Sequence, residues 1–117
     1  MRDLGFGRTG SYADRKELDQ IAQGLCGLIS FAGSGPGRPP VKVGAPVSAI
    51  AAGILGAVRM AAAYTHELCR GDGQIVDTML FEAIADDYWQ SAIAFATGAA
   101  PGPMGSAHPL NAPCQAS

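Results

Sequence analysis

The sequence predicts a mainly α-helical single domain that is organised around one long apolar helix. The central stretch from Ala49 to Tyr64 contains a single charged residue, Arg59. On both sides of it, apolar residues recur with the spacing of one helix face. Only one short segment is rich in β-branched residues. We therefore expect three helices, at about 15–30, 48–70 and 79–97, and one short strand at about 74–78.

Composition limits the size and the class of the protein. The 117 residues are 48% hydrophobic and 15% charged, which is typical of one globular domain over 1–117, with an irregular tail at 98–117. The net charge is −2 and the basic residues are scattered, so the sequence contains no basic patch of the kind that binds nucleic acid or an acidic membrane surface. The 3 cysteines lie far apart without a CxxC pair. We therefore expect no disulfide framework, no metal site, no tightly held cofactor and a cytoplasmic location.

The first predicted helix, at about 15–30, has one apolar face and one polar face. Gly24 and Gly27 each weaken this helix by about 1 kcal/mol, but they permit close approach of a neighbouring helix. Its apolar face comprises Leu18, Ile21, Ala22, Leu25, Cys26 and Ile29.

Residues with known conformational preferences mark the start and the end of the central helix, before the strand. Ser48 is expected to cap the helix, because its hydroxyl oxygen accepts a hydrogen bond from a first-turn N–H. Gly71 and Gly73 are expected to end the helix, because glycine adopts left-handed backbone angles without strain. The following segment, Gln74–Thr78, has the β-branched content of a strand.

The third predicted helix, at about 79–97, follows Thr78, whose hydroxyl is the expected cap. Its acidic residues lie on the face opposite the apolar stripe, where solvated carboxylates are usual. The predicted stripe comprises Phe81, Ile84, Ala85, Tyr88, Ala92 and Phe95.

The central helix is apolar nearly all round, so it has to be covered by other elements. One small chain has only two further helices for this purpose, and a lone strand leaves two unpaired edges. We therefore expect an intertwined homo-oligomer. A membrane span is the alternative, but Arg59 near mid-span would cost about 2.5–3.5 kcal/mol, and we expect no membrane insertion.

Five motifs in the same order resemble those of one family, the class III (CaiB/BaiF-type) CoA-transferases. Together they cover nearly the whole chain, which is expected to be a family fragment, short at both ends and equivalent to part of the large domain. The motifs are GFGRTGSYADR at 5–15, the segment from Asp19 to Gly33, PVKVG at 40–44, PVSAIAAG at 46–53 continuing to RGDGQIVDTMLFEA at 70–83, and HPLNAP at 108–113.

The resemblance implies transfer of CoA from an acyl-CoA to a carboxylate through an aspartate nucleophile. In the family that aspartate lies three residues after the proline that precedes the long helix, and here Ala49 takes its place. Ser48 is the nearest hydroxyl, and we interpret it as a cap and not as a nucleophile. The histidine that the racemase branch carries before the first helix's aspartate is also missing, because Leu18 precedes Asp19. No catalytic residue is therefore intact.

The matched motifs leave Tyr12, Asp19, Gln23 and Ala49 as the residues that could contact a CoA thioester or a carboxylate. Each also has a plain structural interpretation, and for Asp19 that is a solvated helix carboxylate. Two function classes follow. The first is a transferase-like protein that is inactive as this chain but retains acyl-CoA or carboxylate binding. The alternative is a non-catalytic oligomerising or protein-interaction module built on the same helical scaffold.

Overall fold

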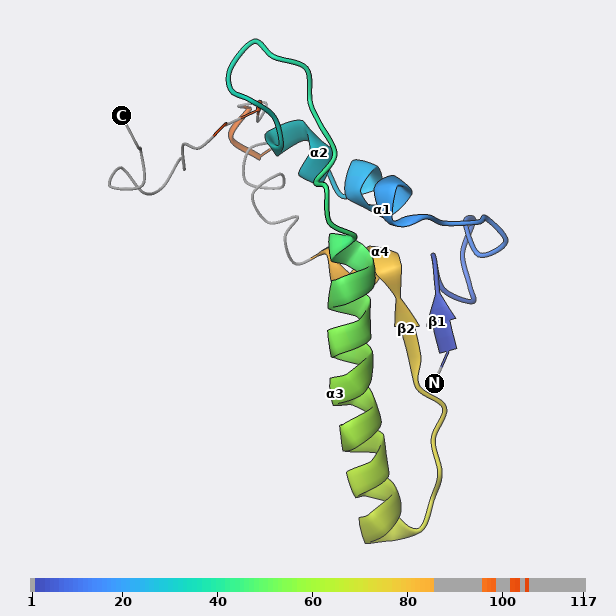
Figure 1. Cartoon of the computed structure of the whole chain (residues 1–117). Helices are drawn as coiled ribbons and strands as arrows, with labels where there is room; N and C mark the ends of the chain where they lie inside the picture. Colours follow the sequence, from blue (N-terminus) through green and yellow to red (C-terminus); the bar gives the residue numbers. More distant parts are fainter. Residues whose placement is uncertain (1, 86–95, 99–101, 104, 106–117) are drawn as a thin grey trace.

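The structure, a computed structural model, describes residues 2–85, 96–98, 102–103 and 105. In this part of the chain a long helix stands beside a small parallel sheet, and three short helices gather near its start (Figure 1). The fold class is confirmed as mainly helical, although the elements differ in detail from those expected. They are β1 (Arg2–Leu4), α1 (Asp19–Leu25), α2 (Leu28–Phe31), α3 (Val47–Arg70), β2 (Asp77–Met79) and α4 (Leu80–Ala83).

The long helix α3 matches the predicted central helix within one residue at its start. It has 24 residues and ends at Gly71, whose φ of 79° is left-handed and whose N–H donates to the Glu67 carbonyl oxygen at 2.7 Å. Glycine reaches this conformation without the steric penalty of a side chain. By length and composition α3 could cross a membrane, and it is the one such helix in the described part of the chain.

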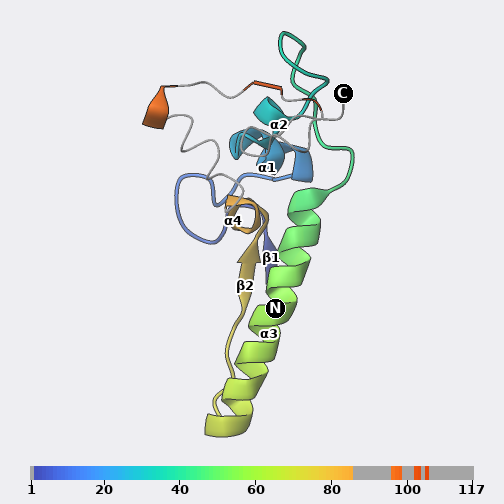
Figure 2. The same cartoon turned by 90° about the vertical axis from the view of Figure 1, so that its left-hand side faces the viewer.

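A second strand, β1, was not predicted. It pairs in parallel with β2, with Arg2 opposite Asp77 and Leu4 opposite Met79. Two parallel strands need a long crossover connection, and here that connection includes α3 (Figure 2). The predicted strand at 74–78 is shifted to Asp77–Met79, because strand pairing starts only where β1 lies alongside.

The core is small and lies where α1, α3 and α4 meet. Its buried apolar side chains are Ala22, Cys26, Ala52 and Ile84. Alanine and cysteine at these positions let the helices approach closely, which is consistent with the small residues of the predicted apolar faces. Most of the apolar surface of α3 lies outside this core.

Arg59 links the middle of α3 to the sheet and to α4. Its guanidinium donates to both carboxylate oxygens of Glu82, at 3.1 and 2.8 Å, and to the Asp77 carbonyl oxygen at 3.1 Å. The hydrogen bond and the charge of Arg59 lower the pKa of Glu82. A bidentate pair of this kind fixes orientation as well as distance.

The first predicted helix is broken into α1 and α2. The break is at Gly27, whose φ of 80° is left-handed and incompatible with a continuous helix. The helix also begins at Asp19 and not near residue 15. Of the third predicted helix, Leu80–Ala83 is observed as α4, whereas 86–95 lies outside the described residues.

Because the helix is broken at Gly27, alanine substitutions at Gly27 and at Gly24 should have opposite effects on the stability of the fold. Gly27→Ala should destabilise the fold by about 1–2 kcal/mol, because alanine is strained in the left-handed region. Gly24→Ala is the matched control inside α1, where an added methyl meets only Ile29 Cδ1 at 3.7 Å. It should stabilise the fold by about 0.5–1 kcal/mol. Denaturant melts of both variants measure this, and equal effects would contradict the assigned break.

Candidate functional site

The start of α3 is held by a carboxylate from another helix. Oδ1 of Asp19, the first residue of α1, accepts hydrogen bonds from the N–H groups of Ser48 at 2.8 Å and Ala49 at 3.1 Å, and from the Ser48 hydroxyl. These N–H groups have no partner within the helix itself. The expectation that Ser48 caps the helix is therefore wrong. The helix begins one residue earlier, at Val47, and the buried Ser48 hydroxyl donates to Asp19.

Gln23 lies one turn after Asp19 on α1 and completes the same network. Its Nε2 donates to Asp19 Oδ2 at 2.5 Å and to the Ala45 carbonyl oxygen at 3.3 Å, while its Oε1 accepts from the Val43 N–H at 3.0 Å. The side chain is fully buried. Residues four apart on a helix share a face, so Asp19 and Gln23 together hold the segment that leads into α3.

The charge state of Asp19 follows from this network. Burial by itself would raise the pKa of Asp19, but the hydrogen bonds donated by Ser48, Ala49 and Gln23 outweigh it and lower the pKa. The positive end of the α3 dipole favours the same ionised form. Asp19 is therefore a carboxylate with its acceptor sites in use, and the interpretation of a merely solvated side chain is wrong.

A small pocket of about 250 Å³ lies beside this network, between the start of α1 and the segment that leads into α3. Ala49, at the expected nucleophile position, is exposed, and its N–H is bonded to Asp19. Lys42, which is not among the predicted ligand-binding residues, is the one cation among the described residues that line the pocket. The lining residues are Leu18, Asp19, Gln20, Lys42, Gly44, Ala45 and Pro46.

Tyr12 lies outside this arrangement. Its ring packs against Phe6, with centroids 5.3 Å apart, and the Arg15 guanidinium lies over it at 4.4 Å. Tyr12 does not line the pocket beside Asp19. The structure thus brings together Asp19, Gln23 and Ala49, while the contacts of Tyr12 are with its own loop.

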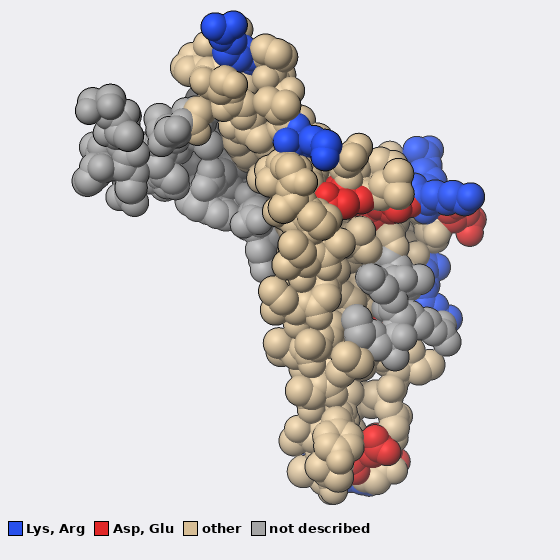
Figure 3. Space-filling view, in the orientation of Figure 1, with Lys and Arg blue, Asp and Glu red and all other residues tan. Residues whose placement is uncertain are grey.

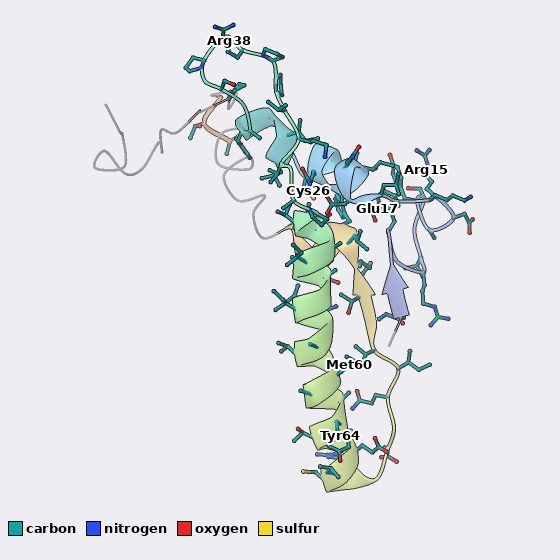
Figure 4. The ribbon with its side chains drawn as sticks, in the orientation of Figure 1. Arg15, Glu17, Cys26, Arg38, Met60 and Tyr64 are labelled. Carbon is teal, nitrogen blue, oxygen red and sulfur yellow. The ribbon has the colours of Figure 1, made fainter. Side chains whose placement is uncertain are left out.

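Glu17, which is not among the predicted site residues, is an unusual group two residues before Asp19. Both of its carboxyl oxygens are buried and accept no hydrogen bond from the described residues. Burial raises the pKa of Glu17 to about 7. The labelled Glu17 lies beside α1, near the upper end of the sheet (Figure 4). Its ionisation opposes the fold, in contrast to that of Asp19, which supports it.

The fold and the site together define a unit of two parallel strands joined through a long helix, with a carboxylate and a small pocket at the helix start. The sequence pattern of CoA-transferase family III matches residues 3–116. The chain belongs to CoA-transferase family III.

Individual relatives support this assignment. The chain is 35% identical to a succinate–glutarate CoA-transferase from Agrobacterium fabrum, over 93% of this chain and 27% of the relative. It is 36% identical to the alpha subunit of a succinyl-CoA–L-malate CoA-transferase from Chloroflexus aurantiacus, over 72% of this chain and 20% of the relative.

A solved structure is also similar. The crystal structure of a CaiB/BaiF family protein from Brucella suis matches with a TM-score of 0.79 and 34% identity, over 95% of this chain and 29% of that protein. The chain therefore spans 20–29% of the length of these three proteins.

The Asp19 network predicts a pH-dependent effect of Asp19→Ala. Loss of a capping carboxylate should destabilise the fold by about 0.5–2 kcal/mol at pH 7. The folded-state pKa of Asp19 is lowered from 3.8, so its contribution is complete above that value and is lost as the pH falls through the folded pKa. The difference between parent and variant should therefore shrink only below pH 3.8.

Denaturant melts across this pH range test the prediction. Asp14→Ala is the matched control, since Asp14 is exposed on the preceding loop. A difference between parent and Asp19→Ala that stays constant down to pH 2 would show that the carboxylate charge is not what holds α3.

Proposed function

We propose that this chain is a CoA-transferase-like protein that binds an acyl-CoA or a carboxylate beside the start of α3, and that the isolated chain does not catalyse CoA transfer. The observation that supports the proposed lack of catalysis is that residue 49 is an alanine. It occupies the position of the family's aspartate nucleophile, at a helix start where an anion is stabilised. In this chain the anion at that helix start is supplied by Asp19.

The ligand chemistry is supported by the relatives and by the pocket. The relatives' names refer to succinate, glutarate and malate, which are all dicarboxylic acids. The pocket beside Asp19 is smaller than the roughly 300–1,000 Å³ of a typical drug-sized site. It therefore suits the small acid, or the acyl end of the thioester, and not the whole of CoA. The three widely spaced cysteines support a cytoplasmic location.

Asp19 is not a replacement nucleophile in this proposal. A carboxylate attacks a thioester through a free oxygen lone pair, and the acyl group then passes to that oxygen as CoA thiolate leaves. Oδ1 of Asp19 already accepts three hydrogen bonds, and Oδ2 accepts one from Gln23. Attack would break the bonds that hold α3, and the lowered pKa makes the oxygen a weaker nucleophile.

The first consequence concerns covalent chemistry. The isolated chain should form no hydroxylamine-sensitive acyl-enzyme when it is incubated with succinyl-CoA, as followed by intact-protein mass spectrometry. Ala49→Asp is the informative companion, because it restores a carboxylate at the exposed position. An adduct on the unmodified chain would overturn the proposed inactivity. An adduct on the variant alone would support position 49 as the nucleophile position.

A second candidate function, an oligomerising module, is favoured by the exposed surface of α3. Charged side chains are nearly absent from the face of α3 turned to the viewer (Figure 3). Ile54, Val58 and Leu68 are 62, 62 and 69% exposed. Apolar side chains at this spacing form one stripe along the helix, and a contiguous apolar surface of this kind usually marks an interface.

The stripe predicts that the chain is an obligate homo-oligomer. Light scattering after size exclusion should give at least twice the 11.9 kDa mass of one chain. Val58→Glu should dissociate the assembly or unfold it, because a carboxylate in an apolar interface costs several kcal/mol. Gln74→Glu, on the exposed segment that follows α3 and outside the stripe, is a control of equal charge. A folded monomer of the unmodified chain at micromolar concentration would rule out this assembly.

A further inference from the structure

One face of α3 points away from the rest of the described chain. The residues of α3 that contact other elements lie on one side, where Ser48 and Ala52 are buried and Arg59 is bonded to β2 and α4. At about 100° of rotation per residue, Ile54 and Leu68 lie on the opposite side, and both are more than half exposed. The sheet, α1 and α4 likewise lie on one side of α3 (Figure 2). The described elements therefore leave this face of α3 uncovered.

The apolar residues of this face recur at intervals of four and three residues in alternation. Such an alternation averages 3.5 residues, which is the repeat with which two helices pack along each other in a coiled coil. At 100° per residue the repeat stays within about 40° of one line along α3, so its members form a single seam. All six residues of the seam are uncharged and exposed. They are Ile50, Ile54, Ala57, Ala61, Tyr64 and Leu68.

The order of large and small side chains along the seam is the same in both directions. Two large residues lie at each end and two alanines lie in the middle, and the pairs are equally distant from position 59. A twofold interface between identical chains requires this match, because each residue of one copy then meets its counterpart in the other. The central alanines allow the two helices to approach closely. The matched pairs are Ile50 with Leu68, Ile54 with Tyr64, and Ala57 with Ala61.

We propose that α3 packs antiparallel against α3 of a second copy along this seam, so that Leu68 of one copy contacts Ile50 of the other. This inference rests on the self-association described above as the second candidate function. Two such faces bury on the order of 1,000 Å² in total, which is the lower limit of a specific interface.

Two features favour the antiparallel over the parallel orientation. The ends of a helix carry opposite partial charges, so antiparallel neighbours place unlike charges side by side. The short helices of the chain gather near the start of α3 (Figure 1). An antiparallel pair places them beside the bare second half of α3 in the other copy, whereas a parallel pair places both sets at the same end.

Cross-linking of paired positions tests the orientation. In the full chain with Cys69 and Cys114 replaced by serine, Ile50→Cys and Leu68→Cys are made separately and also produced together in one cell. A short bismaleimide should join the two variants to each other and should join neither variant to itself. In the antiparallel pair the two copies of position 50 lie roughly 27 Å apart along the helix axis, at 1.5 Å per residue. Cys26 is buried and stays in place.

A second measurement tests the seam without cross-linking. Tyr64→Ser should raise the dissociation constant of the dimer at least tenfold, because a large side chain is lost from two equivalent contacts. His66→Ser is the matched control, since position 66 lies on the side of α3 opposite the seam, beside the pocket between α3 and the segment at 74–77. It should leave the dissociation constant unchanged. Sedimentation of a dilution series measures both variants.

The outcomes separate this arrangement from self-association itself. A cross-link within Ile50→Cys alone or Leu68→Cys alone shows a parallel pair, which overturns the proposed orientation while self-association stands. A dimer that forms no cross-link in any sample, or that tolerates Tyr64→Ser, uses another surface, and the seam is overturned. If the unmodified chain is monomeric at micromolar concentration, self-association fails, the inference fails with it, and the face of α3 is left to a lipid bilayer or a different protein.

Discussion

The hydrogen bonds between the Asp19 carboxylate and the start of α3 hold the long helix against α1. They join the first residue of α1 to two N–H groups that the long helix cannot satisfy itself. Gln23 extends the same contact to the backbone at Val43 and Ala45. The same helix is part of the crossover between the two parallel strands, and its Arg59 donates a hydrogen bond to the Asp77 carbonyl oxygen at the start of β2. The small core between α1, α3 and α4 is then completed by side chains as small as alanine.

This interaction also shapes the chemistry of the site. A helix start stabilises one nearby anion well, and a second carboxylate beside it raises the pKa of the pair. In this chain the anion is Asp19, while the exposed Ala49 carries no charge. In the proposed function, this uncharged side chain stands at the family's nucleophile position. Family membership and the fold agree with one another.

The apolar stripe of α3 is exposed in the single chain. The described elements bury only Ser48, Ala52 and Gly56 of α3 completely, all near its start. Among the described residues, the second half of α3 is flanked by the segment that returns to β2 (Figure 1). Burial of apolar surface is the main favourable term in folding. The apolar side chains of α3 that remain in water contribute little to the stability of the single chain, and they would contribute more if another molecule covered them.

The elements that depend on local chemistry could be predicted from the sequence. The length of α3, its end at Gly71 and the helical faces follow from hydrophobic period and from glycine, which act within a few residues. Features that depend on contacts between residues distant in sequence could not be predicted in this way. Asp19 and Ser48 are 29 residues apart, so sequence could not show that the aspartate caps the helix and that the serine donates to it. Strand β2 is confined to Asp77–Met79 because β1 lies opposite only there. A single lysine in a loop has no sequence feature that places it at a pocket. Only the fold shows that Lys42 lies beside α1 and lines the pocket.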